Sequence, residues 1–212
     1  MNGDYTRFRF DPLKDFSTVL MQQGRVQLDS DWNEMMEMLD RRWRSETIDI
    51  IGECVVPTTT PHGFEIYQVD GDLMIGPGRL YLHGLQVEHH GNAEAHSFDA
   101  VLAEMRAKHG TLADAQWKDD EWRMFATGID KQPYLGVEEA ALPRDGRHLV
   151  FLDAWQREVG YLGDEELIDP AIGVDTTTRT QTAWRVRLLQ VPDGTQCSSP
   201  PEKIEAWQDL VR

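Results

Sequence analysis

The stretch from Asp29 to Gly52 constrains the fold most, because it carries the periodicity of one long helix. Seven side chains recur there at intervals of three and four, which aligns them on one face of an α-helix. These residues are Trp32, Met35, Met36, Leu39, Trp43, Thr47 and Ile50. Asp29 or Ser30 is a suitable N-cap, and Gly52 stands at the C-cap position. We therefore expect a long amphipathic helix that packs on its own chain, with packing on a partner helix as the alternative.

The residues before this helix follow a second pattern. Between Gly3 and Phe10, aromatic, polar and basic side chains alternate with a period of two, which is typical of a strand or an extended arm. Asp11 and Pro12 end the pattern. A terminal segment of this kind lies across its own domain or across a neighbouring subunit. We expect an N-terminal arm, and both ways of packing it remain open.

Short apolar runs separated by turn residues follow the helix. The runs are Phe64–Val69, Leu73–Ile75, Arg79–His83 and Leu85–Glu88. Asp70-Gly71-Asp72 and Gly76-Pro77-Gly78 are typical turn sequences between them. The sequence therefore predicts a small antiparallel meander.

The second half of the chain mixes helical and strand patterns. The expected elements are helices at 97–108 and 117–124, strands at 147–155 and 180–191, a loop at 193–201 and a helix start at 204–211. The predicted class is α+β: an N-terminal extended arm and long amphipathic helix, then a mainly antiparallel β domain with short helices. The predicted division is an arm and helix at 1–56, a β-rich domain at 57–192, and a C-terminal loop and helix start at 193–212.

Charge limits the partners of this chain. It has 37 acidic and 21 basic residues and a formal net charge of −16, which repels the phosphate backbone of nucleic acid. No run approaches the ~20 apolar residues of a membrane-spanning helix, and residues 1–10 lack the apolar stretch of a signal peptide. Cys54 and Cys197 form no CxxC pattern. We expect folding in a reducing compartment, without nucleic-acid binding or membrane insertion.

A group of histidines is the best candidate for chemistry, since neutral imidazole is a common zinc ligand. The group is His83, His89, His90 and His96, with Glu88 and Glu94 nearby. HExxH is absent, however, and neighbouring residues on a strand point to opposite faces. The acidic runs at 119–121 and 164–166 lack the calcium-loop pattern, and nucleophile-elbow and phosphate-loop motifs are absent too. The sequence therefore predicts no catalytic residue, no metal and no cofactor.

Two longer motifs resemble a known family. The first is MQQGRVQLDSDWNE at 21–34, leading to DIIG at 49–52; the second is LDAWQREV at 152–159, followed by DPAIG at 169–173 and DTTTRTQTAWRV at 175–186. Together with the hairpin-like stretch at 78–88, they resemble an uncharacterised family found in gene clusters of contractile injection systems and related phage tails. The resemblance spans most of residues 3–191.

This resemblance implies a particle rather than a reaction. It implies a structural subunit, either baseplate-associated (cage, spike-associated or fibre-anchoring) or a cap or cap adaptor. The implied partners are further copies of the chain and baseplate, sheath, tube or cap subunits. Assembly is expected in the bacterial cytoplasm, into an intracellular or released particle. The predicted subunit contacts lie in 3–28 and 31–51, at Tyr5, Phe8, Phe10, Arg25, Trp32, Met35 and Trp43.

The motifs also suggest local contacts. Gly24 permits a tight approach of arm and helix, and Arg25 can pair with Asp29 or Asp31. Charges near the ends of the two late strands can form a paired network. Those charges are Arg157, Glu158, Asp175, Arg179 and Arg185, beside Trp155.

Two other functions stay open as alternatives. One is a particle-associated, metal-dependent hydrolase or effector that uses the histidine group. The other is a carbohydrate-binding module for cell-surface recognition, with Trp117, Trp122 or Trp207 as stacking platforms.

Overall fold

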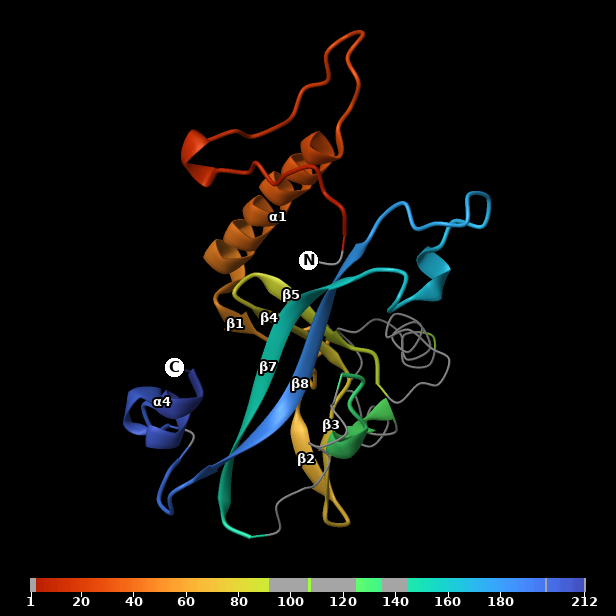
Figure 1. Cartoon of the computed structure of the whole chain (residues 1–212). Helices are drawn as coiled ribbons and strands as arrows, with labels where there is room; N and C mark the ends of the chain where they lie inside the picture. The colour runs from red at the N-terminus through yellow and green to blue at the C-terminus, as the bar shows by residue number, and fades with distance from the viewer. Residues whose placement is uncertain (1–2, 92–106, 108–124, 135–144, 197, 212) are drawn as a thin grey trace. The chain divides into compact units, whose positions relative to one another are not determined.

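The computed structural model describes residues 3–91, 107, 125–134, 145–196 and 198–211 (Figure 1). The helices expected at 97–108 and 117–124 lie outside the described residues, apart from Ala107. The chain divides into two compact units. The first contains Met1–Val56, Leu80–Gln86 and Gln156–Gln181, and the second contains Pro57–Arg79, Val87–Trp155 and Thr182–Arg212.

Helix α1, Asp29–Ile51, is the main element of the first unit. Its N-cap is Leu28, one or two residues earlier than the predicted Asp29 or Ser30, and the Leu28 amide donates to Asp31 Oδ2 at 3.2 Å. Because a leucine side chain has no acceptor, the carboxylate of Asp31 supplies the side-chain part of the cap. Gly52 is the C-cap, as predicted, with φ at 111° and its amide bonded to Ile48 O at 2.9 Å.

The predicted apolar face of α1 is only partly covered. Met35 and Leu39 are half-buried. Trp32 is 59% exposed, Trp43 is 58% exposed and Ile50 is 82% exposed. Packing on the same chain, which we expected for the whole face, does not hold for these last three side chains.

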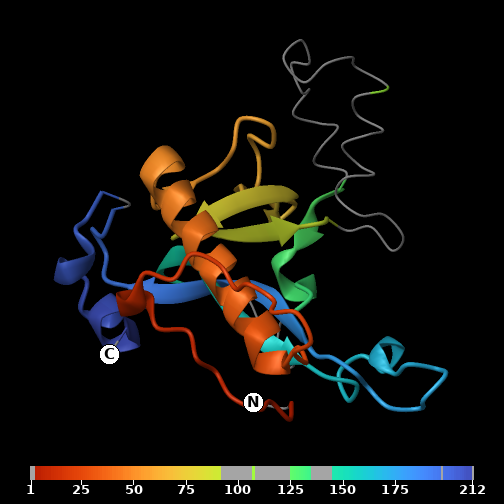
Figure 2. The same cartoon turned by 90° about the horizontal axis from the view of Figure 1, so that it is seen from above.

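Residues 3–28, which we call the N-terminal segment, form no strand and contain one short 3-10 helix, Pro12–Lys14. Figures 1 and 2 show the segment folding back beside α1, where Thr18 Oγ1 reaches Met35 Sδ at 3.7 Å. Most of its side chains are exposed. The period-two pattern of residues 3–10 therefore does not produce a strand.

The short strands of residues 54–128 form two sheets. Strands β1 (Cys54–Val55), β4 (Gly78–Leu82) and β5 (Leu85–His89) form one sheet in the order β1-β4-β5. Strands β2 (Ile66–Val69), β3 (Asp72–Ile75) and β6 (Thr127–Gly128) form the other in the order β2-β3-β6. The β2–β3 and β3–β6 pairs are antiparallel. The four predicted strands are therefore confirmed, but the single meander is wrong.

The chain changes sheets at Gly76-Pro77-Gly78. Pro77 has no amide hydrogen to donate to a neighbouring strand. Gly78 has φ at 146°, and a Cβ added to it would lie 2.6 Å from the Cα of Gly63. The backbone of Gly78 thus packs closely against Gly63, which is far from the turn in the sequence. This contact separates β3 from β4.

Strands β7 (Arg147–Val159) and β8 (Arg179–Val191) form a two-stranded sheet. Both strands were predicted, although β7 continues past Trp155. The loop between them contains a 3-10 helix, Glu165–Leu167. Helix α4, Glu205–Val211, confirms the predicted helix start near the C-terminus.

Trp184 lies in the core of the second unit and is 2% exposed. Its ring meets Phe64 and His89 edge-on, with centroids 5.0 and 4.9 Å apart. Its Nε1–H donates to Glu88 O at 2.9 Å. An aromatic group with its polar atom satisfied can be fully buried, which makes this cluster the centre of the core.

The helices and the mostly antiparallel strands make the chain an α+β protein with a β-rich part. In the described part of the chain, no helix has the length and apolar character needed to cross a membrane.

Candidate functional site

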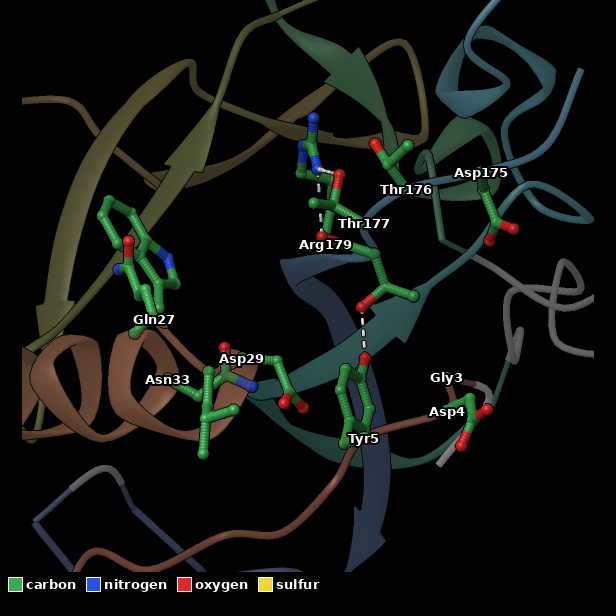
Figure 3. Close-up of a pocket in the computed structure, with 13 residues that line it drawn as sticks. Gly3, Asp4, Tyr5, Gln27, Asp29, Asn33, Asp175, Thr176, Thr177 and Arg179 are labelled. Atoms are coloured by element: carbon green, nitrogen blue, oxygen red, sulfur yellow. Dashed lines mark hydrogen bonds between the residues drawn. The ribbon is translucent and has the colours of Figure 1, made fainter. Parts of the chain in front are cut away.

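A groove opens in the first unit between the N-terminal segment, the first turns of α1 and the residues that lead into β8. Its volume is about 830 Å³, and we call it the N-terminal groove. It is lined by residues 3–5, 27–29, 32, 33 and 175–179. Figure 3 shows Asp29 and Asn33 on one side and Asp175 and Thr176 on the other, with Tyr5 between them. Most of the residues that line it have polar side chains.

Tyr5 ties the N-terminal segment to this groove. Its hydroxyl donates to Glu158 Oε1 at 2.5 Å, and it also makes a hydrogen bond with the Thr178 hydroxyl. Because the only hydroxyl proton of Tyr5 goes to the carboxylate, Thr178 is the donor in the second bond. Burial, followed by the bond to Glu158, raises the pKa of Tyr5 above its ordinary value. Tyr5 therefore remains a protonated donor near neutral pH.

Thr6 makes the second attachment. Its amide donates to Asp29 Oδ2 at 2.8 Å, and its hydroxyl donates to Asp29 Oδ1 at 2.5 Å. The hydroxyl bond, followed by the amide bond, lowers the pKa of the Asp29 carboxyl. Asp29 also stands in the first turn of α1, where the helix dipole favours a negative charge. Thr6 therefore holds the start of the chain against the first turn of α1 by two hydrogen bonds.

The seven predicted contact residues take different positions. Tyr5 and Trp32 line the groove. Phe8 is exposed, and its ring meets that of Tyr5 edge-on with centroids 5.3 Å apart. The remaining four are Phe10 and Met35, which are half-buried, and Arg25 and Trp43, which are exposed. Their contact with another subunit stays a prediction.

The expected roles of Gly24 and Arg25 are wrong. Gly24 has φ at 71°, and no atom lies within 4 Å of a Cβ built there, so it serves a turn rather than a tight approach. Arg25 forms no ion pair with a described residue. Asp29 accepts from Thr6 instead, and Asp31 accepts from Leu28.

The charges on the late strands pair differently from the expectation. Arg185 Nε donates to Asp153 Oδ2 at 3.2 Å, and the Arg185 guanidinium lies 5.5 Å from the Trp155 ring centroid. Arg157 Nε donates to Gln181 Oε1 at 2.8 Å. Glu158 binds Tyr5, a contact that sequence analysis missed.

The loop between β7 and β8 presents more apolar side chains to solvent. It is ordered by internal bonds, such as those that Asp164 Oδ1 and Asp169 Oδ1 accept from the amides of Glu166 and Ala171. The acidic run at 164–166 thus shapes a turn. The exposed apolar residues of the loop are Tyr161, Leu162, Ile172 and Val174.

The candidate residues for the alternative functions are placed as follows. His83 and His90 are exposed, and His89 is buried with its ring nitrogens bonded to Gly76 O and Thr127 Oγ1 at 3.0 and 2.9 Å. Among the residues that the structure describes, no group of three or more His, Cys, Asp or Glu side chains is placed to hold a metal ion. Trp207 is half-buried and meets Phe151 edge-on, with centroids 5.2 Å apart. The candidates that fall outside the described residues are His96, Glu94, Trp117, Trp122 and the run at 119–121.

Comparison with known proteins gives one match. A family model covers residues 1–199 of the chain, and its description is a family of unknown function, DUF6519. No curated protein and no solved structure matches. The N-terminal groove lies entirely within the matched residues.

Proposed function

The chain belongs to the DUF6519 family, and we propose that it is a structural subunit of a phage-tail-like contractile injection particle. It acts by self-assembly and by contact with baseplate, sheath, tube or cap subunits, rather than by catalysis. A baseplate position, as a cage, spike-associated or fibre-anchoring component, fits the proposal, and so does a cap or cap-adaptor position. The motifs at 21–34 and 152–186, which resemble components of such particles, support it.

The observation that carries the proposal is the exposed apolar surface of residues 8–51. Leu13 is 89% exposed, Leu20 is 80% exposed and Val26 is 84% exposed. The other exposed large apolar side chains here are Phe8, Phe16, Met21, Leu28, Trp32, Met36, Trp43, Ile50 and Ile51. This stretch holds more than half of such side chains in the described part of the chain. Large exposed apolar patches typically mark interaction surfaces.

In this proposal the N-terminal segment is an extended arm, and α1 is an amphipathic helix whose uncovered face packs on a neighbouring subunit. Trp32 and Trp43 would then be buried between subunits. Tryptophan is enriched among the residues that dominate interface energies. A ring of identical copies requires heterologous contacts that close by symmetry, and an arm reaching a neighbour supplies such a contact.

Self-assembly is tested by size-exclusion chromatography with light scattering on the intact chain and on a variant that lacks residues 1–16. We expect a defined oligomer for the intact chain and dissociation after truncation. A matched control replaces Val69 and Val211, exposed apolar residues outside the 8–51 stretch, by serine, and it should keep the oligomer. Monomers for both the intact and the truncated chain would contradict self-assembly.

The place of the chain in a particle needs a second test. Contractile particles purified from the producing bacterium are expected to contain the chain by mass spectrometry, and deletion of its gene should disturb their assembly. Normal particles that lack the chain would refute the proposal.

A further inference from the structure

Residues 3–5 form one wall of the N-terminal groove, and hydrogen bonds of Tyr5 and Thr6 attach this wall to the rest of the unit. Tyr5 reaches Glu158 and Thr178, and Thr6 bonds twice to Asp29. These acceptors and donors come from β7, from the residues before β8 and from α1. The contacts are specific to the segment 3–6, so a second copy of that segment would fit the same site equally well.

The residues that connect this segment to α1 are held much less firmly. Among the described residues, one hydrogen bond joins residues 7–27 to another element, from Thr18 Oγ1 to Met35 Sδ at 3.7 Å, and a thioether is a weak acceptor. The remaining hydrogen bonds of this stretch are local, such as Lys14 N to Asp11 O and Arg25 N to Gln22 O. Moving this connection away from its own unit therefore breaks few hydrogen bonds.

The connection is also long enough to reach a neighbour. Residues 7–27 span up to about 70 Å when extended. A compact unit of about 100 residues has a radius of gyration of about 13 Å. The arm can therefore cross from one copy to the groove of the next without any change in α1.

We propose that in the assembled oligomer residues 3–6 of one copy form this wall of the N-terminal groove in a neighbouring copy, bonded to that copy's Asp29, Glu158 and Thr178 in place of its own segment. This inference rests on the proposed self-assembly and specifies its contact. The exchanged site keeps every hydrogen bond of Tyr5 and Thr6, because both partners are copies of one sequence. Exchange of an identical element is a low-cost route to oligomers.

A cysteine pair split between two chains tests the exchange. Cys54→Ser and Cys197→Ser are first introduced into both chains to remove the native thiols. One chain then carries Thr6→Cys, and a second, tagged chain carries Asp29→Cys, at positions whose side chains touch. The two chains are co-expressed, oxidised and separated on a non-reducing gel. A matched control replaces Thr6→Cys by Ser17→Cys, on an exposed residue of the same segment.

We expect a disulfide-linked product of the two different chains that the Ser17→Cys control lacks. A single chain that carries both Thr6→Cys and Asp29→Cys reports whether the contact forms within one copy. Closure of that chain on itself, without a product linking the two different chains, overturns the exchange. Absence of both products also overturns it, because the Thr6–Asp29 contact itself would then be missing.

Light scattering on the same samples separates the two proposals. An oligomer without interchain disulfides overturns arm exchange but leaves self-assembly intact. A monomer without interchain disulfides overturns both.

Discussion

Lowering the pH should destabilise the second unit through one buried histidine. His89 is enclosed by the aromatic rings of Phe64 and Trp184. Its Nδ1 lies 3.0 Å from Gly76 O, and its Nε2 lies 2.9 Å from Thr127 Oγ1. A carbonyl only accepts, so Nδ1 carries the proton of the neutral ring and Nε2 accepts from the hydroxyl. The neutral ring is therefore satisfied, and a second proton would be placed in a site that water does not reach.

Burial lowers the pKa of His89 from its ordinary 6.5 to about 4. Above pH 6.5 the ring is neutral in both the folded and the unfolded chain, and it causes no pH dependence. Below that value His89 is protonated in the unfolded chain but not in the folded chain. The free energy of unfolding therefore falls until the pH reaches the folded pKa of about 4. The window is about 2.5 pH units at about 1.4 kcal/mol each, which gives a loss of about 3.5 kcal/mol, of which about 2 kcal/mol is lost by pH 5.

The assay is urea unfolding at pH 7 and pH 5, followed by circular dichroism. The wild type should lose about 2 kcal/mol more free energy of unfolding over this interval than a His89→Gln variant, which cannot titrate. The comparison uses only the change with pH, so any neutral-pH cost of His89→Gln cancels. His83→Gln, which alters an exposed histidine of the first unit, should behave as the wild type. Equal pH dependence in the wild type and His89→Gln would refute the reasoning.

Three other changes test the fold and the assembly. Gly78→Ala should lower the free energy of unfolding by at least about 2 kcal/mol in urea, because the new Cβ would meet the Cα of Gly63. Gly71→Ala, also at positive φ but with no atom within 4 Å of the new Cβ, should lower it less. Equal losses for the two variants would contradict the clash. Trp43→Ser should weaken self-association roughly tenfold or more by light scattering, while Val211→Ser, at the same exposure, should not. Raising salt from about 0.01 to about 1 M shortens the Debye length from about 30 to about 3 Å, so association of these acidic chains should strengthen; weakening would mean that ion pairs dominate the contact.

The elements with a clear period could be predicted from the sequence, because their signals are local. The apolar spacing of α1 and the glycine at its C-terminus place it within a residue or two. The β-branched and aromatic runs of β7 and β8 likewise give two long strands. The N-cap lies one or two residues earlier than predicted because the side chain of Asp31, rather than that of Asp29 or Ser30, accepts from a backbone amide at this helix end, the amide of Leu28.

The N-terminal groove could not be predicted, because its contacts join distant residues. Tyr5 was singled out as a contact residue, but its partners Glu158 and Thr178 lie 153 and 173 positions away. Glu158 and Thr178 stand in the motifs at 152–159 and 175–186, but nothing in those motifs indicates a contact with the N-terminal residues. The break of the expected meander has the same cause, since it depends on Gly63 approaching Gly78. Sequence patterns predict local backbone geometry, whereas the groove and the break between the two sheets depend on tertiary contacts.

Electrostatics alone does not decide whether the arm stays on its own copy or crosses to a neighbour. Residues 5–10 carry Arg7 and Arg9 and no acidic residue, while Asp29 and Glu158 bind the arm. This attraction is the same within one copy and between two. The exposed apolar side chains of residues 8–28, such as Leu13, Leu20 and Val26, decide between the two arrangements, because on one copy they remain in water. Crossing to a neighbour can cover them, at about 25 cal/mol per Å² of apolar area buried, so the exposed connection rather than the bound tip favours exchange.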